Sequence, residues 1–459
     1  MRRHRKPAFG LLVIILVAAP ARADSPPKAV PWKFDVVTLK TTPATVLRGL
    51  LGEETPRGMR FQVVQRKPGR PTHVFATLLK RDEIGQIERL SDEDRKLLQE
   101  RIQEIEQNSP EAEKERLGAL ELQPIAWGDK KEGGWRYSSD FFDLTSNAPE
   151  EIVRRTVLHF EQIYTAYARF LPPRHQGGRP TAVLLLTDLN DYRKMLLEQK
   201  QPFLNPAFFD PASNRIVCAS DLELLGQKLA SVKHAHQRMR AELDKAEAEF
   251  SKLYKGKERA AMLQPIADKR RELNAADKRN NDLFNLATRT LFATLYHEAF
   301  HAYAASFVYP PPAELPRWLN EGLAQIFETA LIDAGELRIG HADAARLTRA
   351  KDALKKNELV SLTDLLCSGP KQFMLAHVGN KQVSDRYYLT SWGLASFLTF
   401  ERRLLGSAAL DRYVEALREG QDERTAFEEL TGQPLPQFET EFRKYLQHLQ
   451  PDGTVATAK

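Results

Sequence analysis

Cysteine is scarce in this chain of 459 residues, which contains only Cys218 and Cys367. Two cysteines are too few for a cysteine-ligated zinc site, so the sequence excludes that class of metal centre. In an oxidising compartment they could form one disulfide, or each could be a small buried side chain. Sequence spacing leaves both options open.

Long apolar runs are also missing beyond the N-terminus, so no later segment is expected to span a membrane. The apolar run from Phe9 to Ala19 covers about 11 residues, short of the roughly 20 needed to cross a bilayer. It follows several basic residues and precedes Ala-Arg-Ala at 21–23, a pattern that signal peptidase accepts. We therefore expect residues 1–23 to be a Sec-type signal peptide and the protein to be secreted or periplasmic. An uncleaved anchor is the alternative.

A strong excess of one charge is absent as well. The formal net charge is +6, and much of that excess lies in the basic start of the predicted signal peptide. The rest of the chain is close to neutral, so nucleic acid is not an expected partner. Hydrophobic residues make up 42% of the chain and charged residues 28%, a balance typical of globular proteins with a full core.

The chain divides into several predicted regions after a linker at 24–33. Short β-type runs separated by turn residues, such as "MRFQVVQRK" and "THVFATLLK", predict a small SH3-like β-barrel at 34–88. Residues 89–122 carry a capping sequence that starts at Ser91 and predicts a connecting helix. Strands and helices then alternate before a mostly helical C-terminal half, so 123–459 is predicted as one domain and the fold class as α+β.

Residues 221–282 have the pattern of an inserted helical hairpin. Apolar residues from Leu225 to Leu253 alternate four and three apart, which is the period of a coiled-coil seam. The spacing resumes after Gly256, so we expect two antiparallel helices that protrude from the domain and offer a possible surface for a protein partner. His234 and His236 lie here without an acidic residue at ligand spacing and are interpreted as surface or seam residues.

The strongest chemical signal is "HEAFH" at 297–301. His297 and His301 are four residues apart, so both imidazoles project from one helix face and can bind the same Zn²⁺ ion. Glu298 lies beside that face, where a carboxylate can accept the proton of a metal-activated water. Helical histidines without a metal are the alternative reading of these five residues alone.

The context favours the metal site. The surrounding helix is strongly apolar, and buried histidines need polar partners. Glu321 follows His301 by twenty residues, inside "RWLNEGLAQIFE", which is predicted as the next helix. A third ligand from that helix completes a two-histidine, one-glutamate set and leaves the fourth position open for water.

At these residues the sequence resembles the gluzincin zinc peptidases, most closely the peptidase-MA-like family of exported bacterial proteins. The resemblance rests on "HEAFH" followed by Glu321 in "WLNEGLA", extends over about 135–445, and includes "RYYLTSWGLASFL" at 386–398. It implies a gluzincin-like fold for 123–459, His297, His301 and Glu321 as zinc ligands, and Glu298 as the general base.

The resemblance also implies residues around the ligands. A tyrosine hydroxyl near the developing oxyanion is expected to be that of Tyr388, with Tyr387 second; a packing role is equally consistent with either. Asn320 fits a supporting position beside the ligands, or a simple capping role. The acid that often orients the first histidine is replaced by Gln325, so either Glu328 substitutes for it or that support is weaker.

An edge strand for main-chain pairing with a peptide is expected at 214–220, "NRIVCAS". The Gly-x-Met-Glu-Asn element of related aminopeptidases, which anchors a free amine, is missing from the sequence. Endopeptidase activity on a peptide or protein substrate is therefore favoured over aminopeptidase activity.

Three hypotheses follow from these patterns. The first is an exported zinc metallopeptidase. The second is a non-catalytic protein of the cell envelope that binds through the β domain and the hairpin and keeps a residual or structural zinc site. The third is zinc-dependent hydrolysis of another amide, such as one in the cell wall.

Overall fold

The structure is a computed structural model that describes residues 31–40, 46–55, 58–79, 81–106, 115–174, 178–198, 207–219, 223–328, 331–333, 336–338, 343–373 and 381–456. Its fold class is α+β, as the sequence predicts. The expected signal peptide at 1–23 lies outside the described residues. Among the helices that are described, none combines the length and the apolarity needed to cross a bilayer.

The N-terminal region is a five-stranded antiparallel sheet in the order β4-β3-β2-β1-β5. Its elements are β1 (Asp35–Leu39), β2 (Val46–Thr55), β3 (Gly58–Gln65), β4 (His73–Leu79), the 3-10 turn η1 (Arg81–Glu83), β5 (Ile84–Glu88) and α1 (Asp92–Glu106). Val37 and Phe61 are buried on one face, while Leu98 and Ile102 of α1 pack with Leu50 on the other. Within the described residues β4 and β5 remain unpaired edges, so the predicted SH3-like barrel is not confirmed.

The main body contains a six-stranded mixed sheet in the order β10-β11-β9-β8-β7-β6. The strands are β6 (Gln123–Trp127), β7 (Lys130–Ser138), β8 (Phe142–Ser146), β9 (Thr181–Leu186), β10 (Ala207–Asp210) and β11 (Arg215–Ala219). The pairs β8–β9 and β9–β11 are parallel. The buried helix α3 (Glu150–Phe170) connects β8 to β9, and α4 (Leu189–Glu198) follows β9.

The expectation of an edge strand at 214–220 is wrong. Residues 215–219 form β11, which lies between β9 and β10 and has partners on both sides. The edge strand next to β11 is β10. Its four residues, "AFFD", are too few to show the alternation by which strands are identified.

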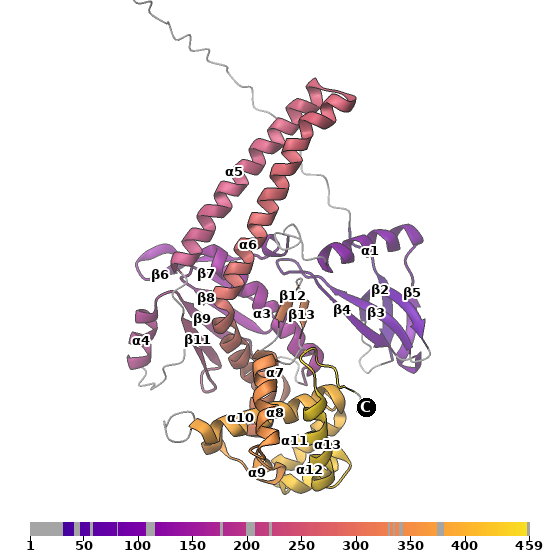
Figure 1. Cartoon of the computed structure of the whole chain (residues 1–459), viewed down its shortest axis with the longest axis vertical. Coiled ribbons are helices and arrows are strands. Elements are labelled where there is room, and N and C mark those ends of the chain that lie inside the picture. The colour runs from indigo at the N-terminus through magenta and orange to yellow at the C-terminus, as the bar shows by residue number, and fades with distance from the viewer. Residues whose placement is uncertain are drawn as a thin grey trace, which may run out of the picture.

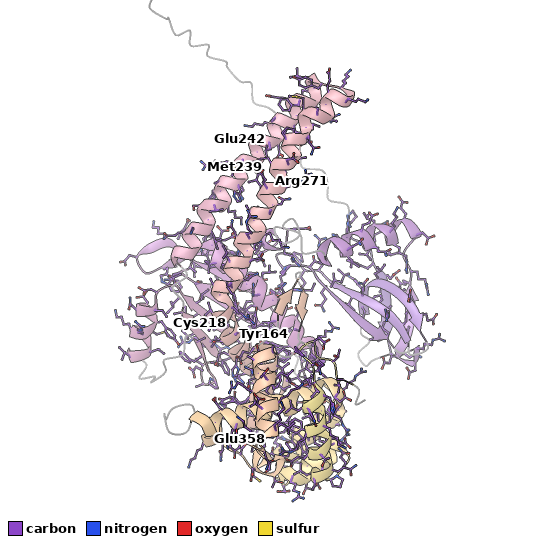
Figure 2. The ribbon with its side chains drawn as sticks, viewed as in Figure 1. Tyr164, Cys218, Met239, Glu242, Arg271 and Glu358 are labelled. Carbon is purple, nitrogen blue, oxygen red and sulfur yellow. The ribbon has the colours of Figure 1, made fainter. Side chains whose placement is uncertain are left out.

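Two long helices form the hairpin that the coiled-coil seam predicts. They are α5 (Glu223–Leu253) and α6 (Gly256–Tyr303), and they extend away from the body as an antiparallel pair (Figure 1). In Figure 2, Met239, Glu242 and Arg271 lie on this extension, far from Tyr164 and Cys218 in the body. Asp277 of α6 binds His236 and Arg240 of α5, so His236 is a seam residue with an acidic partner on the other arm.

The same helix α6 continues into the core, where its C-terminal half is flanked by α3, β10 and α7. The C-terminal half of the chain consists of the π-helical turn η2 (Ala304–Val308), α7 (Arg317–Glu328), β12 (Leu331–Asp333), β13 (Glu336–Arg338), α8 (Ala344–Lys355), α9 (Leu362–Leu366), η3 (Pro370–Phe373), α10 (Lys381–Ser396), η4 (Phe397–Glu401), α11 (Ala408–Arg418), α12 (Glu423–Thr431) and α13 (Leu435–His448). One hydrophobic core joins the larger sheet to these helices.

Both cysteines have free thiols. Cys218 is buried in β11, whereas Cys367 is exposed after α9. The structure therefore favours the separate-thiol option that the sequence left open.

Candidate metal centre

The crossing of α6 and α7 creates the site. Leu295 and Phe300 of α6 are fully buried, whereas His297 and His301 of the motif are only partly buried. On α7, Trp318 is fully buried while Glu321 points toward α6. Apolar packing on both helices therefore fixes the distance between the histidine face of α6 and the carboxylate of α7.

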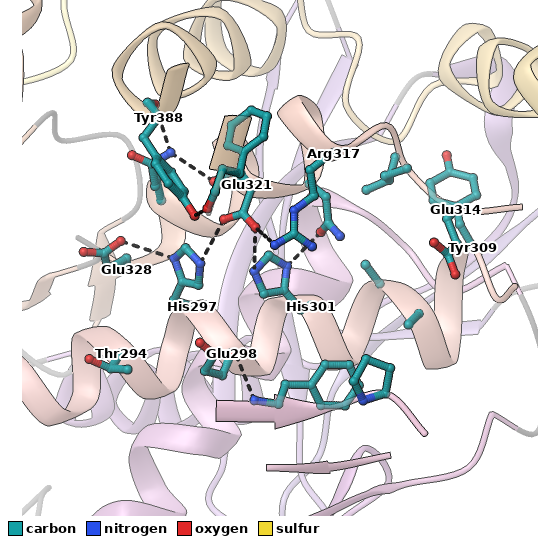
Figure 3. Close-up of a pocket in the computed structure, with 18 of the residues that line it drawn as sticks. Thr294, His297, Glu298, His301, Tyr309, Glu314, Arg317, Glu321, Glu328 and Tyr388 are labelled. Atoms are coloured by element: carbon teal, nitrogen blue, oxygen red, sulfur yellow. Dashed lines mark hydrogen bonds and ion pairs between the residues drawn. The ribbon is translucent and has the colours of Figure 1, made fainter. Parts of the chain in front are cut away.

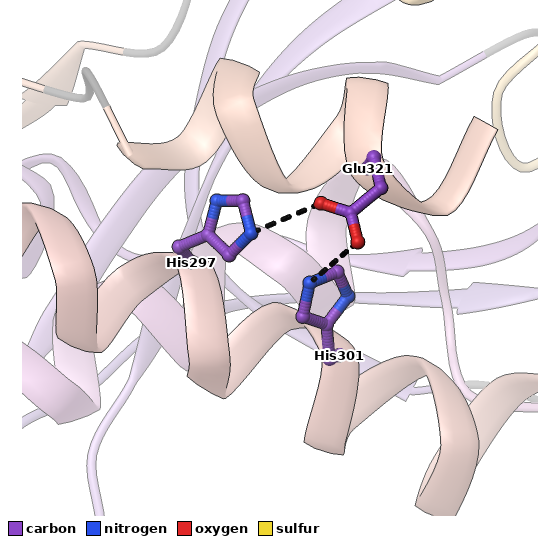
Figure 4. A group of neighbouring side chains, drawn as sticks. All are labelled: His297, His301 and Glu321. Atoms are coloured by element: carbon purple, nitrogen blue, oxygen red, sulfur yellow. Dashed lines mark ion pairs between the residues drawn. The ribbon is translucent and has the colours of Figure 1, made fainter. Parts of the chain in front are cut away.

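The three predicted ligands meet at this crossing (Figure 4). One potential ligand atom from each of His297, His301 and Glu321 lies within 4.8 Å of the other two. His297 Nε2 is 3.2 Å from Glu321 Oε2, and His301 Nε2 is 3.8 Å from Glu321 Oε1. Two ligands with bonds of about 2 Å to a tetrahedral ion are roughly 3.3 Å apart, so this spacing suits zinc.

The buried Glu321 Oε2 is a second indication that these residues suit a cation. This oxygen makes no hydrogen bond within the described residues, even though His297 Nε2 is close by. A buried carboxylate oxygen without a donor is costly, whereas a metal ion would satisfy it and the two ring nitrogens together. The residues present therefore fit a divalent cation.

Further side chains contact the Nδ1 atoms of the two candidate ligand histidines (Figure 3). His301 Nδ1 is 3.0 Å from Asn320 Oδ1, and His297 Nδ1 is 3.3 Å from Glu328 Oε2. With the Nδ1 proton directed to these oxygens, each Nε2 presents its lone pair to the site. Arg346 Nη2 in turn binds Glu328 Oε1 at 3.2 Å.

The structure shows which groups Gln325 and Glu328 contact. The amide nitrogen of Gln325 donates to the backbone carbonyl oxygens of Glu321 and Tyr388, at 3.2 and 3.0 Å. Glu328, one turn away, occupies the position that the sequence analysis offered as its substitute.

The electrostatics of the cluster reflect three ionisable groups in a confined space. Burial lowers the pKa of His297, but the carboxylates of Glu321 and Glu328 outweigh burial and raise that pKa to about 10. Burial lowers the pKa of His301 to about 4. Burial would raise the pKa of Glu321, yet His301, His297 and Arg317 keep it below its ordinary value. Glu321 is therefore ionised, as a metal ligand must be.

Glu298 lies beside the ligand cluster and lines the same cavity. Its Oε2 accepts a hydrogen bond of 2.9 Å from the backbone N–H of Phe209 in the edge strand β10. Burial raises its pKa, which brings the carboxyl group closer to the range in which a general base works at neutral pH. One contact thus connects the candidate base to the sheet edge.

The cavity has a volume of about 1360 Å³ and contains all five predicted site residues. Tyr388 of α10 lines it, whereas Tyr387 does not. The Tyr388 hydroxyl donates to the Phe373 carbonyl oxygen at 2.9 Å, and burial raises its pKa. The structure thus separates the two tyrosine candidates by position.

Several lining residues were missed by the sequence analysis. Arg317 Nη2 is 2.7 Å from Glu321 Oε1, a contact that the i, i+4 spacing in "RWLNE" could have indicated. Arg346 on α8 and the backbone of Phe209 come from distant segments, and no local pattern signals them.

A protein-family model matches part of the chain. Residues 291–413 match a family described as "Protein of unknown function (DUF1570)". This segment is roughly a quarter of the chain and includes both histidines, Glu298, Glu321 and Tyr388. No curated protein and no solved structure matches the chain.

Proposed function

We propose that the chain is an exported zinc-dependent metallopeptidase of the gluzincin type, more suited to endopeptidase than to aminopeptidase action. The observation that carries this proposal is the group of three ligand atoms within 4.8 Å of one another, beside a buried carboxylate in one cavity. A purely structural zinc site normally closes its fourth position with a protein ligand and needs no base. Here three protein ligands and Glu298 face an open cavity.

His297, His301 and Glu321 would hold the ion, with Asn320 and Glu328 fixing the imidazole orientations. Bound zinc supplies a Lewis acid and lowers the pKa of a bound water. With the ion in place, Glu298 would accept a proton from the attacking water and donate it to the leaving amine. Its hydrogen bond from Phe209 holds one carboxylate oxygen and leaves the other directed to the cavity.

Tyr388 is proposed to stabilise the negative charge that develops on the substrate carbonyl oxygen. Tyr388 and Phe373 both line the cavity, and the Tyr388 hydroxyl donates to the Phe373 carbonyl oxygen. When substrate binds, this hydroxyl would donate to the substrate carbonyl oxygen instead. Removal of one such donor costs about 10²–10³-fold in turnover, so the effect of Tyr388→Phe distinguishes this role from packing.

The test compares peptide hydrolysis by the zinc-loaded protein and by its Glu298→Gln variant, with a quenched fluorescent peptide library as substrate. We expect the variant to keep its zinc and lose activity by about 10²–10⁴-fold, the usual contribution of a general base. Full activity with zinc bound would disprove the mechanism. A protein that binds zinc but cleaves no peptide would support the non-catalytic alternative.

A further inference from the structure

The charges that line the cavity are distributed unevenly. Four arginines contribute to the lining: Arg179, Arg317, Arg346 and Arg349. Two of them have acidic partners that are not metal-ligand candidates: Arg346 Nη2 is 3.2 Å from Glu328 Oε1, and Arg349 Nη2 is 3.5 Å from Asp385 Oδ2. Their charges are therefore compensated by the protein itself.

Arg317 is in a different situation. Its guanidinium is 2.7 Å from Glu321 Oε1, the carboxylate of a proposed metal ligand. The Arg317 side chain is 46% exposed, while that of Glu321 is 2% exposed. A guanidinium has five N–H donors, so this single contact leaves donors directed to the cavity. In Figure 3, Arg317 lies beside His301 and Glu321, on the side where Tyr309 and Glu314 are found and away from Glu328.

Arg179 belongs to the same end of the cavity. Its carbonyl oxygen accepts a hydrogen bond of 3.1 Å from Asn214 Nδ2, and Asn214 Oδ1 accepts one of 3.2 Å from Ser306 Oγ, just after α6. The Arg179 side chain is exposed and makes no ion pair with the residues that the structure describes. Glu314 is also exposed at this end, so two cationic side chains share the region with one further carboxylate.

Metal binding changes the balance around Arg317. When Glu321 binds a divalent cation, the negative charge of the carboxylate is compensated by the ion. Within the described part of the chain, Arg317 forms an ion pair with Glu321 and with no other acid. With a cation on Glu321, the guanidinium is therefore close to a second positive charge. A cationic group in this position attracts an anion from the substrate, and a carboxylate matches the planar donor geometry of arginine.

Resting on the proposed function, we infer that Arg317, assisted by Arg179, binds a substrate carboxylate next to the scissile bond. Arg317 contacts Glu321, a proposed metal ligand. The distance from its guanidinium to a carbonyl that reacts at the metal is therefore about the length of one peptide residue. The carboxylate can belong to the C-terminus of the peptide or to an aspartate or glutamate side chain. In the first case the enzyme removes residues from C-terminal ends, and in the second it cleaves internally beside acidic residues.

The inference is tested by calorimetric binding of short peptide hydroxamates, which chelate zinc, to the zinc-loaded full-length chain. One pair differs only in a free or an amidated C-terminus, and a second pair, both amidated, differs only in glutamate or glutamine beside the hydroxamate. We expect one carboxylate ligand to bind about 10–100-fold more tightly than its neutral match, the value of a charge-assisted hydrogen bond. The pair that shows this preference identifies the source of the carboxylate.

Variants assign the preference to Arg317. In Arg317→Gln the preference disappears while the neutral ligand keeps its affinity, and in Arg317→Lys part of the preference remains. Arg349→Gln, on an arginine with its own acidic partner, keeps the full preference. A purely structural role of Arg317 would weaken both ligands of a pair equally.

Equal binding of carboxylate and neutral ligands by the wild-type protein would overturn this inference and leave the zinc site intact. This comparison needs no variant, so it holds even if Arg317→Gln fails to fold. Absence of hydroxamate binding to zinc-loaded protein would overturn the proposed function, and the inference with it.

Discussion

The close contact of α7 and α10 at Gly322 provides a quantitative test of how the site is held. A Cβ atom added to Gly322 would lie 2.4 Å from the Ser391 carbonyl oxygen and 2.8 Å from Ala395 Cβ. The first partner is backbone, so the two helices must move apart. Such overpacking costs about 1–3 kcal/mol, against a gain of about 1 kcal/mol when alanine replaces glycine in a helix. The clash with backbone places the cost toward the upper end of its range, so after this offset we expect Gly322→Ala to lower the free energy of unfolding by up to about 2 kcal/mol.

The matched control is Gly393→Ala in α10. The nearest atoms to its added Cβ are those of the Phe442 ring at 3.4 Å, an ordinary contact distance. This variant is expected to be as stable as wild type or up to about 1 kcal/mol more stable. Urea unfolding of the metal-free proteins, followed by circular dichroism, measures both changes.

The same substitution should also affect metal binding, because Gly322 directly follows the proposed ligand Glu321. A displaced α7 moves the carboxylate relative to the histidines of α6, so zinc affinity falls in Gly322→Ala and not in Gly393→Ala. Equal stability and equal zinc affinity of the two variants would show that the helix crossing does not determine the ligand geometry, and would refute this reasoning.

Further predictions concern the contacts of the two histidine Nδ1 atoms and the response to acid. Asn320→Ala and Glu328→Ala should each weaken zinc binding by about 10–100-fold, because each leaves a histidine Nδ1 without its acceptor; unchanged competition against a zinc chelator would contradict this. Burial lowers the pKa of His159, which stacks on Phe292, to about 3. The unfolded chain then binds more protons than the folded one, so this stability contribution is complete above about pH 6.5 and falls by about 1.4 kcal/mol per unit as pH decreases toward 3. Urea unfolding at pH 7 and 5 should show a smaller loss for His159→Gln than for wild type, and equal losses would contradict the prediction.

The sequence indicated that His297, His301 and Glu321 come together, as they do in the structure, because these signals are local or have a marked spacing. Two histidines four apart define one helix face, and Glu321 lies in a segment with a clear helical pattern. Tyr388 lines the cavity and Tyr387 does not, a difference in position that the sequence of two adjacent residues does not show. The coiled-coil period likewise indicated both helices of the hairpin.

Other features depend on contacts between distant segments and had no sequence signal. The edge strand β10 has only four residues. The sequence instead predicts the more strand-like segment of β11 as the edge, although β11 lies inside the sheet. The N-terminal region is β-rich, as the sequence predicts, but closure into a barrel depends on whether β4 meets β5, which no strand pattern encodes. Arg346 reaches Glu328 from α8, a helix that the sequence analysis did not connect with the site.

Zinc content is the measurement that tests the central claim most directly. Elemental analysis is applied to the purified wild-type protein and to the variants His297→Ala and His234→Ala. His297 is a proposed ligand, whereas His234 is an exposed histidine on the hairpin and serves as the matched control. We predict about one zinc ion per chain in the wild type and in His234→Ala, and none in His297→Ala after dialysis against a weak chelator. Zinc retained by His297→Ala, or missing from wild type after reconstitution at neutral pH, would contradict the account.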